Sequence, residues 1–580
     1  MRKNLLVAMI VVVCSVMALS VNTSQTNASS FGMVAAANPY ASEVGAYILE
    51  IGGNAVDAAI AVSFAIGVVE PYASGLGGEG YAVIAMADGQ QYAIDFRAAA
   101  PAMATYEKLT EEGLRISTAH RTARGACVPG TLAGVQAIYE LGATLPLETL
   151  MEPAIRLARE GFIVDPTFAQ TIADLYDALL NNAFDFLDEG LAWEAGQLYK
   201  NPDLADTLEH LVTHGLDDFY TGALADAIEA FMIENDGYIR KEDLESYRSF
   251  VREPLHGTYR GYDLYVPHPP VSGPHLIATM NILEHFNLSA FTWDDPLGIH
   301  IIHQAMLLAD LDRRTYISDP DFHDMPIMGL MSKEFARSRA MEISLKQAIN
   351  PDNFWDFVGD AYPYEDGKTY VEVILESLMQ EVATAQEEIY ESPSTTNFTI
   401  IDGDGNAVSW VQTVSSFWGN TYYMNGFFFN NQLQNYAGTY RPGDVINLTP
   451  GMRPRTTICP TIIKKDGVVR WVLGTPGGGR IMSTMTQMIV GLIDFQLPIE
   501  TVVGLPKYAA GTAFRTLPME DTFPESTFQF LSEVFGHNIS LYSYPDLYFG
   551  GPNIISRETS GMIVGVGSIR RDGAASAPEK

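Results

Sequence analysis

Hydrophobic and polar positions recur with different periods along the chain, and these periods separate helical from extended regions. Residues 41–51 and the almost wholly apolar stretch that ends before Pro71 predict two helices, the second buried on most sides. The Gly-rich run 75–80 then breaks the pattern ahead of residues 81–84, which predict a strand. This helix–turn–strand order fits a layered α/β protein.

Longer blocks of one pattern follow. Amphipathic helical spacing dominates residues 145–250, for example over 147–160. Alternating strands with Gly and Asn turns are predicted over 255–268 and 397–475. Residues 345–394 are rich in Glu, Asp, Tyr and Pro, and this composition predicts an exposed loop that suits a cleavage point.

The N-terminus has the layout of a secretory signal. Two basic residues precede an apolar run from Leu5 to Leu19, and a polar stretch follows. The run is too short to predict a membrane span, and no clear A-x-A cleavage site comes after it. We therefore expect residues 1–30 to be a signal peptide or an anchor, and the protein to be periplasmic or extracellular.

Composition predicts a globular protein with a strongly acidic surface. The chain has 580 residues, of which 47% are hydrophobic and 11% aromatic, enough for a large core. Its formal net charge of -35 repels phosphate backbones, so we expect no nucleic-acid partner. Cys127 and Cys459 are the only cysteines after the N-terminal segment, and we expect them to be free thiols in the core.

Several familiar site motifs are incomplete. Residues 402–406 begin like a calcium loop but continue with Ala407 and Thr413 where Gly and Glu are required, so a hairpin turn is expected. The Gly-rich run 474–480 lacks the Lys-Ser/Thr of a P-loop. No H-E-x-x-H, paired Cys-x-x-Cys or G-x-S-x-G pattern occurs, and the histidines are scattered, so we interpret them as structural or exposed.

The run Ser394-Thr395-Thr396 opens a strand-like segment directly after the acidic loop. Taken alone it is ordinary, because β-branched Thr fits a pleated surface. Its surroundings, however, resemble the gamma-glutamyltranspeptidase family over nearly all of the chain that follows the N-terminal segment. The blocks that carry this resemblance are Gly32-Met33-Val34, Gly52-Gly53-Asn54-Ala55-Val56-Asp57, Asp95-Phe96-Arg97, Val128-Pro129-Gly130-Thr131, Leu157-Ala158-Arg159-Glu160-Gly161-Phe162, Lys241-Glu242-Asp243-Leu244, Tyr259-Arg260-Gly261-Tyr262, Ser318-Asp319-Pro320-Asp321-Phe322 and Arg570-Arg571-Asp572-Gly573.

The resemblance implies a precursor that cuts itself before the first Thr of a Thr-Thr pair, here between Ser394 and Thr395. It implies the four-layer αββα sandwich of N-terminal nucleophile hydrolases, formed jointly by a large subunit 31–394 and a small subunit 395–580. The freed α-amine of Thr395 would have a pKa of about 7.7 to 8.0 and could act as the general base for its own hydroxyl.

The resemblance also assigns roles around this nucleophile. Thr413 matches a second threonine that holds the nucleophile, and Gly477-Gly478 matches the pair whose N–H groups receive the oxyanion. Arg97 matches the residue that binds the α-carboxylate of the gamma-glutamyl group, and its planar fork suits a carboxylate. Thr456-Thr457 stands where two serines usually contact the same carboxylate.

The part that would bind the substrate amino group departs from the family. Gln432 is kept, but Ser415 replaces the usual Asn and Asn435 replaces the usual Asp, which removes a charge that would pair with an ammonium group. Asn397 stands where a His usually follows the Thr pair, and residues 435–453 form a shorter segment than the family's lid loop. These departures favour the acylase-like branch of the family, or bulkier gamma-linked chains.

The sequence thus predicts a self-processing amidohydrolase that cleaves gamma-glutamyl amides through a Thr acyl-enzyme, with water, an amino acid or a peptide as the acceptor. No metal or organic cofactor is implied. A glutaryl-amide or cephalosporin-type acylase is the alternative within the enzyme class. A non-catalytic exported binding protein of the same fold is the alternative outside it.

Overall fold

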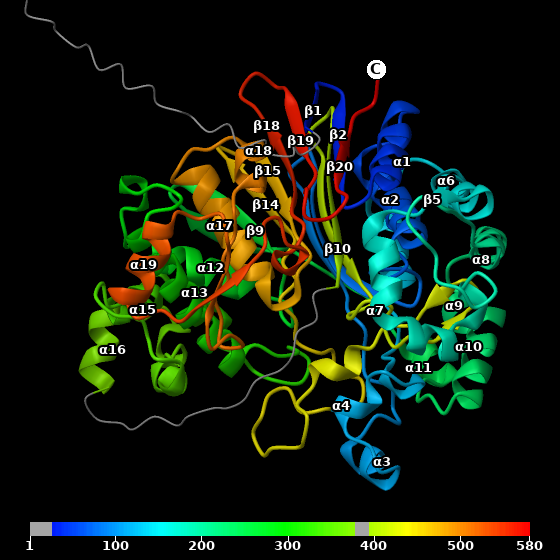
Figure 1. Cartoon of the computed structure of the whole chain (residues 1–580), viewed down its shortest axis with the longest axis horizontal. Coiled ribbons are helices and arrows are strands. Elements are labelled where there is room, and N and C mark those ends of the chain that lie inside the picture. The colour runs from blue at the N-terminus through cyan, green and yellow to red at the C-terminus, as the bar shows by residue number, and fades with distance from the viewer. Residues whose placement is uncertain (1–25, 378–393, 580) are drawn as a thin grey trace, which may run out of the picture.

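Two seven-stranded antiparallel sheets face each other at the centre of the protein (Figure 1). The computed structural model describes residues 26–377 and 394–579. The first sheet has the order β20 (Ala574–Ser576), β2 (Gly32–Ala36), β10 (Thr396–Asp402), β11 (Ala407–Thr413), β3 (Glu79–Ala85), β4 (Gln91–Phe96) and β7 (Phe250–Arg252). The second has the order β1 (Thr26–Ser29), β19 (Ile563–Val566), β18 (Asn553–Arg557), β15 (Val468–Gly474), β14 (Thr461–Lys465), β9 (Tyr262–Val266) and β8 (Leu255–Tyr259).

Helices cover the outer face of each sheet, so the predicted four-layer αββα sandwich is confirmed (Figure 1). The first sheet is covered by α1 (Pro39–Glu50), α2 (Ala55–Val69) and α5 (Thr131–Gly142). The second is covered by α12 (Gly273–Leu283) and α18 (Ile499–Gly504), with α13 (Pro296–Tyr316) and α17 (Ile481–Ile493) packed on α12.

Further helices and short strands lie outside these layers or connect them. The helices are α3 (Tyr106–Glu111), α4 (Ile116–Ala119), α6 (Leu147–Glu160), α7 (Pro166–Asn182), α8 (Pro202–His214), α9 (Asp218–Thr221), α10 (Ala223–Glu234), α11 (Lys241–Ser246), α14 (Ile327–Leu330), α15 (Lys333–Glu342), α16 (Tyr370–Ser377) and α19 (Glu525–Glu533). The strands are β5 (Phe162–Ile163), β6 (Leu198–Tyr199), β12 (Tyr423–Met424), β13 (Phe427–Phe428), β16 (Leu517–Glu520) and β17 (Ile539–Tyr542).

Both faces of the first sheet are buried, and β3 shows how its residues are shared between them. Val83 and Ala85 belong to the apolar cluster between the two sheets, whereas Ala82 and Ile84 pack with the helices of the outer layer. Because successive residues of a strand point to opposite faces, a strand covered on both sides is apolar at nearly every position. This explains the continuous apolar run that predicted the strand.

Local sequence signals account for the first elements. Asn38 and Asn54 cap the N-termini of α1 and α2, and Asn54 forms a capping box with Asp57. The prediction of a hairpin turn in place of a calcium loop is confirmed, because Asp402 Oδ1 accepts the N–H groups of residues 404–406 and closes the turn between β10 and β11. Buried free thiols at Cys127 and Cys459 are also confirmed.

Two predicted segments lie partly outside the described residues. Of the predicted leader 1–30, residues 1–25 are not described, while β1 pairs with β19 at the edge of the second sheet. Of the predicted acidic loop 345–394, residues 378–393 are not described. In the described part the prediction of a loop is wrong over much of its length, because Pro351–Phe357 and Tyr362–Tyr364 form 3-10 helices and α16 follows them. Within the described ranges, no helix is both long enough and apolar enough to cross a membrane.

Candidate active site

Four polar residues lie side by side at one end of the first sheet. Thr395 precedes β10, Thr413 ends β11, Glu79 opens β3 and Arg97 follows β4. In the register of β11 and β3, Thr413 faces Glu79 directly. Facing residues of paired strands project from the same side of a sheet, and here that side is turned toward the second sheet, as is Val83. The row therefore lies at the end of the buried space between the sheets.

The predicted nucleophile, Thr395, is buried next to the Ser394 carbonyl group and the hydroxyl of Thr413. Thr395 Oγ1 lies 3.2 Å from Thr413 Oγ1 and forms a hydrogen bond with the carbonyl oxygen of Ser394. Thr413 Oγ1 in turn accepts the N–H of Ser415 at 2.8 Å. The hydroxyl of Thr395 is thus held against the carbonyl group of the peptide bond that is predicted to be cut.

A buried arginine from the C-terminal segment also contacts this residue. Arg571 donates to the carbonyl oxygen of Thr395, and its Nε donates to Glu70 Oε1 at 3.1 Å. Its guanidinium group lies 5.3 Å from the ring centre of Tyr72, whose hydroxyl donates to the same Glu70 oxygen. Arg571 belongs to the last block of the family resemblance, but no local pattern indicates that it reaches Thr395.

The Gly477-Gly478 pair forms a tight loop after β15. Gly477 has φ +138° and Gly478 φ +53°, conformations that residues with a side chain rarely adopt. Neither N–H donates a hydrogen bond to any residue in the described ranges, although both glycines are buried. Buried N–H groups are almost always paired, so two free donors here are available to an oxyanion. Thr457 Oγ1 fixes the loop by donating to the Gly478 carbonyl at 2.7 Å.

Asn397 links the strand of the nucleophile to the second sheet. Asn553 Nδ2 on β18 donates to the carbonyl oxygen of Asn397 at 3.1 Å and to its Oδ1 at 3.0 Å. A Cβ built on Gly474 would lie 2.6 Å from Asn397 Nδ2, so the end of β15 approaches β10 closely. The residue that departs from the family's His is therefore part of the contact that places the glycine loop near the start of β10.

Arg97 lies at the centre of a buried polar cluster. Its guanidinium group forms an ion pair with Glu79, and both side chains are 0% exposed. Arg97 Nη2 also donates to Gln432 Oε1 at 3.3 Å and to the Pro454 carbonyl at 3.1 Å. Gln432 Nε2 donates to Glu79, and Asn435 Nδ2 donates to Gln432 Oε1. Burial lowers the pKa of Arg97 to about 9, which leaves it charged at neutral pH.

The structure therefore brings Arg97, Gln432 and Asn435 together, but around a carboxylate that the sequence interpretation missed. Glu79 lies in the Gly-rich run 75–80, whose composition indicates a break between elements and hides the start of the strand. One signal was present: Glu79 occupies the same face of its strand as Tyr81 and Val83, a face that is otherwise apolar.

The other predicted substrate-binding residues, Ser415, Thr456 and Thr457, lie outside the hydrogen bonds that join the described residues of the Arg97 cluster. Ser415 Oγ accepts Gln434 Nε2 at 2.8 Å. Thr456 is half-buried, and its N–H donates to the Pro270 carbonyl at 3.1 Å. Thr457 contacts the glycine loop. Among the residues that the structure describes, neither of these threonines forms a hydrogen bond with Arg97.

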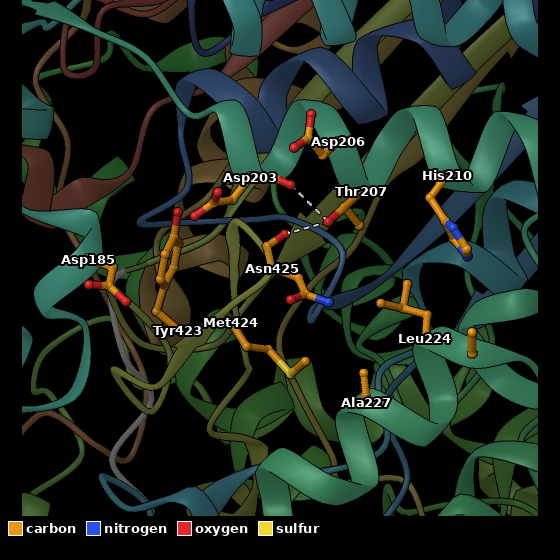
Figure 2. Close-up of a pocket in the computed structure, with 11 residues that line it drawn as sticks. Asp185, Asp203, Asp206, Thr207, His210, Leu224, Ala227, Tyr423, Met424 and Asn425 are labelled. Atoms are coloured by element: carbon orange, nitrogen blue, oxygen red, sulfur yellow. Dashed lines mark hydrogen bonds between the residues drawn. The ribbon is translucent and has the colours of Figure 1, made fainter.

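A cavity of about 660 Å³ lies elsewhere, between α8, α10 and the β12–β13 hairpin (Figure 2). Figure 2 shows Thr207 among the residues that line it, with Oγ1 donating to the carbonyl oxygens of Asp203 at 2.9 Å and Asn425 at 2.7 Å. Its other labelled residues include Asp206 and His210. None of the predicted site residues lines this cavity, so it is separate from the row that begins at Thr395.

Two facing sheets between helical layers, with a buried threonine directly ahead of a central strand, define the class of N-terminal nucleophile hydrolases. The sequence model of the gamma-glutamyltranspeptidase family matches residues 41–578. The chain belongs to this family, and it is an amide hydrolase of the gamma-glutamyltransferase and glutathione hydrolase type.

The relatives include both glutathione hydrolases and acylases. The glutathione hydrolase proenzyme of Escherichia coli is 34% identical over 529 residues, which cover 88% of this chain and 86% of the relative. The acylase ACY 1 proenzyme of Pseudomonas sp. (strain SE83) is 33% identical over 559 residues, covering 94% and 93%. The crystal structure of cephalosporin acylase from Bacillus halodurans matches with a TM-score of 0.84 at 28% identity, covering 96% of this chain and 97% of that one.

Proposed function

We propose that this protein is an exported precursor that cleaves itself between Ser394 and Thr395 and then uses Thr395 to attack gamma-glutamyl or related acyl amides. The observation that carries the proposal is the position of Thr395 Oγ1, against the Ser394 carbonyl group and 3.2 Å from Thr413 Oγ1. Cleavage would yield a large subunit 31–394 and a small subunit 395–580 that share one core.

Self-cleavage would proceed by acyl shift. Thr395 Oγ attacks the Ser394 carbonyl carbon, the C–N bond breaks, and the acyl group moves from nitrogen to oxygen as an ester. Water then hydrolyses the ester, which leaves a carboxylate on Ser394 and a free α-amine on Thr395. Thr413 keeps the attacking hydroxyl in place, and Arg571 orients the Thr395 carbonyl group from the other side.

In turnover the new α-amine would take the proton of its own hydroxyl, because its pKa of about 7.7 to 8.0 lies close to neutral pH. The Thr395 oxygen attacks the substrate carbonyl, and the free N–H groups of Gly477 and Gly478 receive the negative oxygen. Each such donor is typically worth about 2.7 to 4 kcal/mol. The amine leaves, and water, an amino acid or a peptide takes the acyl group.

Two donor classes fit a site of this kind. Gamma-glutamyl amides are favoured by the glutathione hydrolase relatives. Acyl amides without an amino group, as cleaved by glutaryl or cephalosporin-type acylases, are favoured by a specific observation: the position expected to pair with an ammonium group holds Asn435, whose amide is bonded to Gln432. A non-catalytic binding protein is the remaining alternative, and the following experiment tests it.

Intact mass and N-terminal sequencing of wild type and Thr395→Ala test the proposal. Wild type should yield a fragment that begins at Thr395, and the variant should stay one chain. Thr396→Val should be processed like wild type, because the hydroxyl of Thr396 has no hydrogen-bond partner among the described residues. Processed enzyme should hydrolyse a gamma-glutamyl or glutaryl anilide. If wild type remains a single inactive chain, the catalytic assignment is wrong and a binding function becomes the better account.

A further inference from the structure

The chain carries its own carboxylate at the position where the substrate carboxylate is expected. Glu79 is bonded to Arg97 and Gln432 through Oε1, and Oε2 accepts the N–H of Ala98. Glu79 also faces Thr413, the neighbour of Thr395, across the β3–β11 pairing. Its carboxylate therefore lies in the row of residues that begins at the nucleophile.

This ion pair leaves no charge for a substrate carboxylate to neutralise. Arg97 and Glu79 are both fully buried, and the remaining partners of the guanidinium group are the uncharged oxygens of Gln432 and Pro454. A second carboxylate brought to Arg97 would be an uncompensated charge in a region of low dielectric constant, where burial without a partner is costly.

The opposite end of an amino-acid substrate finds no counter-charge either. The residues expected around its ammonium group are Ser415, Gln432 and Asn435, and none of them is charged at any ordinary pH. The carboxylate of Glu79 is committed to Arg97. A free gamma-glutamyl group, with one charge of each sign at its α-carbon, would thus lose its hydration at both charges without gaining an ion pair.

We propose that Glu79 determines acyl specificity by neutralising Arg97, so that the enzyme takes amides whose acyl chain is uncharged at the end next to Arg97. This inference rests on the proposed function, with Thr395 as the nucleophile and the acyl chain directed toward Arg97. The substrate class is an acyl amide whose terminal group is a carboxamide, a peptide-linked carbonyl or a hydrocarbon, in place of a free carboxylate. Glu79 acts through Arg97 and is a positioning residue.

Two substrates whose acyl chains have the same shape test the proposal. Glutaryl p-nitroanilide ends in a carboxylate, and its terminal carboxamide analogue differs only in that group. Wild type should have a kcat/KM about tenfold or more higher for the carboxamide, because one buried unpaired charge is worth at least that factor. Glu79→Gln leaves the charge of Arg97 unpaired, so the ratio of kcat/KM for the glutaryl substrate to that for the carboxamide should rise by about tenfold or more.

A second buried pair provides the matched control. Glu520 and Arg570 are also 0% exposed and form an ion pair, but Glu520 lies on β16, outside the row at Thr395. Glu520→Gln should leave the donor ratio unchanged. The double variant Glu79→Gln/Arg97→Gln removes both charges of the first pair and should restore the preference for the carboxamide.

The outcomes separate the inference from the proposed function. A processed wild type that prefers glutaryl tenfold, or a ratio that is the same in wild type and Glu79→Gln, overturns the role of Glu79 and leaves the nucleophile assignment intact. If Glu79→Gln fails to fold, the substrate ratios of wild type and of the double variant test the role of Glu79. A wild type that is not processed, or that hydrolyses neither donor, contradicts the proposed function and with it the inference.

Discussion

Replacing Thr413 by Val should slow self-cleavage, because one hydroxyl serves two contacts of the site. Thr413 Oγ1 lies 3.2 Å from Thr395 Oγ1 and accepts the Ser415 N–H at 2.8 Å. Val has nearly the same shape, so the change removes these contacts and little else. It leaves the Ser415 N–H buried without an acceptor, a loss of about 1 to 3 kcal/mol.

If the whole loss is felt in the transition state of cleavage, the rate falls by about 5- to 150-fold. Cell-free synthesis followed by a chase would measure it, since the precursor and its two fragments separate on a denaturing gel. The rate constant comes from the decay of the precursor band, which does not depend on any substrate assay.

Thr399→Val is the matched control for this substitution. Thr399 is buried in β10, and its hydroxyl has no hydrogen-bond partner in the described structure. Its replacement should leave cleavage unchanged, because no contact is lost. Equal cleavage rates in Thr413→Val and Thr399→Val would refute the reasoning, since the hydroxyl next to Thr395 would then have no part in maturation.

Three further substitutions test other parts of the fold and site. Gly477→Ala should lower turnover of the processed enzyme at least about tenfold by disturbing the two free N–H groups, whereas Gly561→Ala, also at positive φ but with open space around it, should leave turnover unchanged. Arg571→Met should lower the free energy of unfolding by about 3 to 5 kcal/mol, because Glu70 stays buried without its partner; denaturant titration measures this, and a loss below 1 kcal/mol would contradict it. Burial, together with the neighbouring His300, lowers the pKa of His537 to about 3. As the pH falls below about 6.5, the unfolded chain binds a proton at His537 and the folded chain does not, so the free energy of unfolding should decrease. His537→Gln should reduce that slope by up to about 1.4 kcal/mol per pH unit in pH-dependent unfolding, and an unchanged slope would rule the group out.

Local patterns predicted the elements, because the signals for them lie within a few residues. Apolar spacing and asparagine caps define α1 and α2, and a continuous apolar run after the glycines defines β3. The helix predicted over residues 147–160 is α6 with the same bounds. The resemblance then supplied what local patterns lack, the four-layer arrangement of two sheets between helices, while the order of the strands is known only from the structure.

The contacts within the site could not be predicted in the same way. Arg97 and Glu79 are 18 positions apart, and Arg571 and Thr395 are 176 apart. The sequence gives the types of these residues but not their pairing, which depends on strand register and on the path of the C-terminal segment. A role inferred from a family resemblance therefore identifies the residue at a position. Only the residues that contact it in the structure show whether its charge is already paired.

The departure from the family pattern at position 435 and the presence of Glu79 are explained together by the charges around Arg97. The resemblance leads us to expect a carboxylate at position 435 and a free arginine at position 97. The chain instead has Asn435 and a buried Glu79, so the site keeps one carboxylate but holds it against Arg97. Glu79 together with a carboxylate at position 435 would place two buried carboxylates beside one arginine, so one negative charge would lack a partner, which is costly. The two changes are therefore expected to depend on each other, and restoring Asp at 435 without removing Glu79 should produce a less stable site and not a gamma-glutamyl specific one.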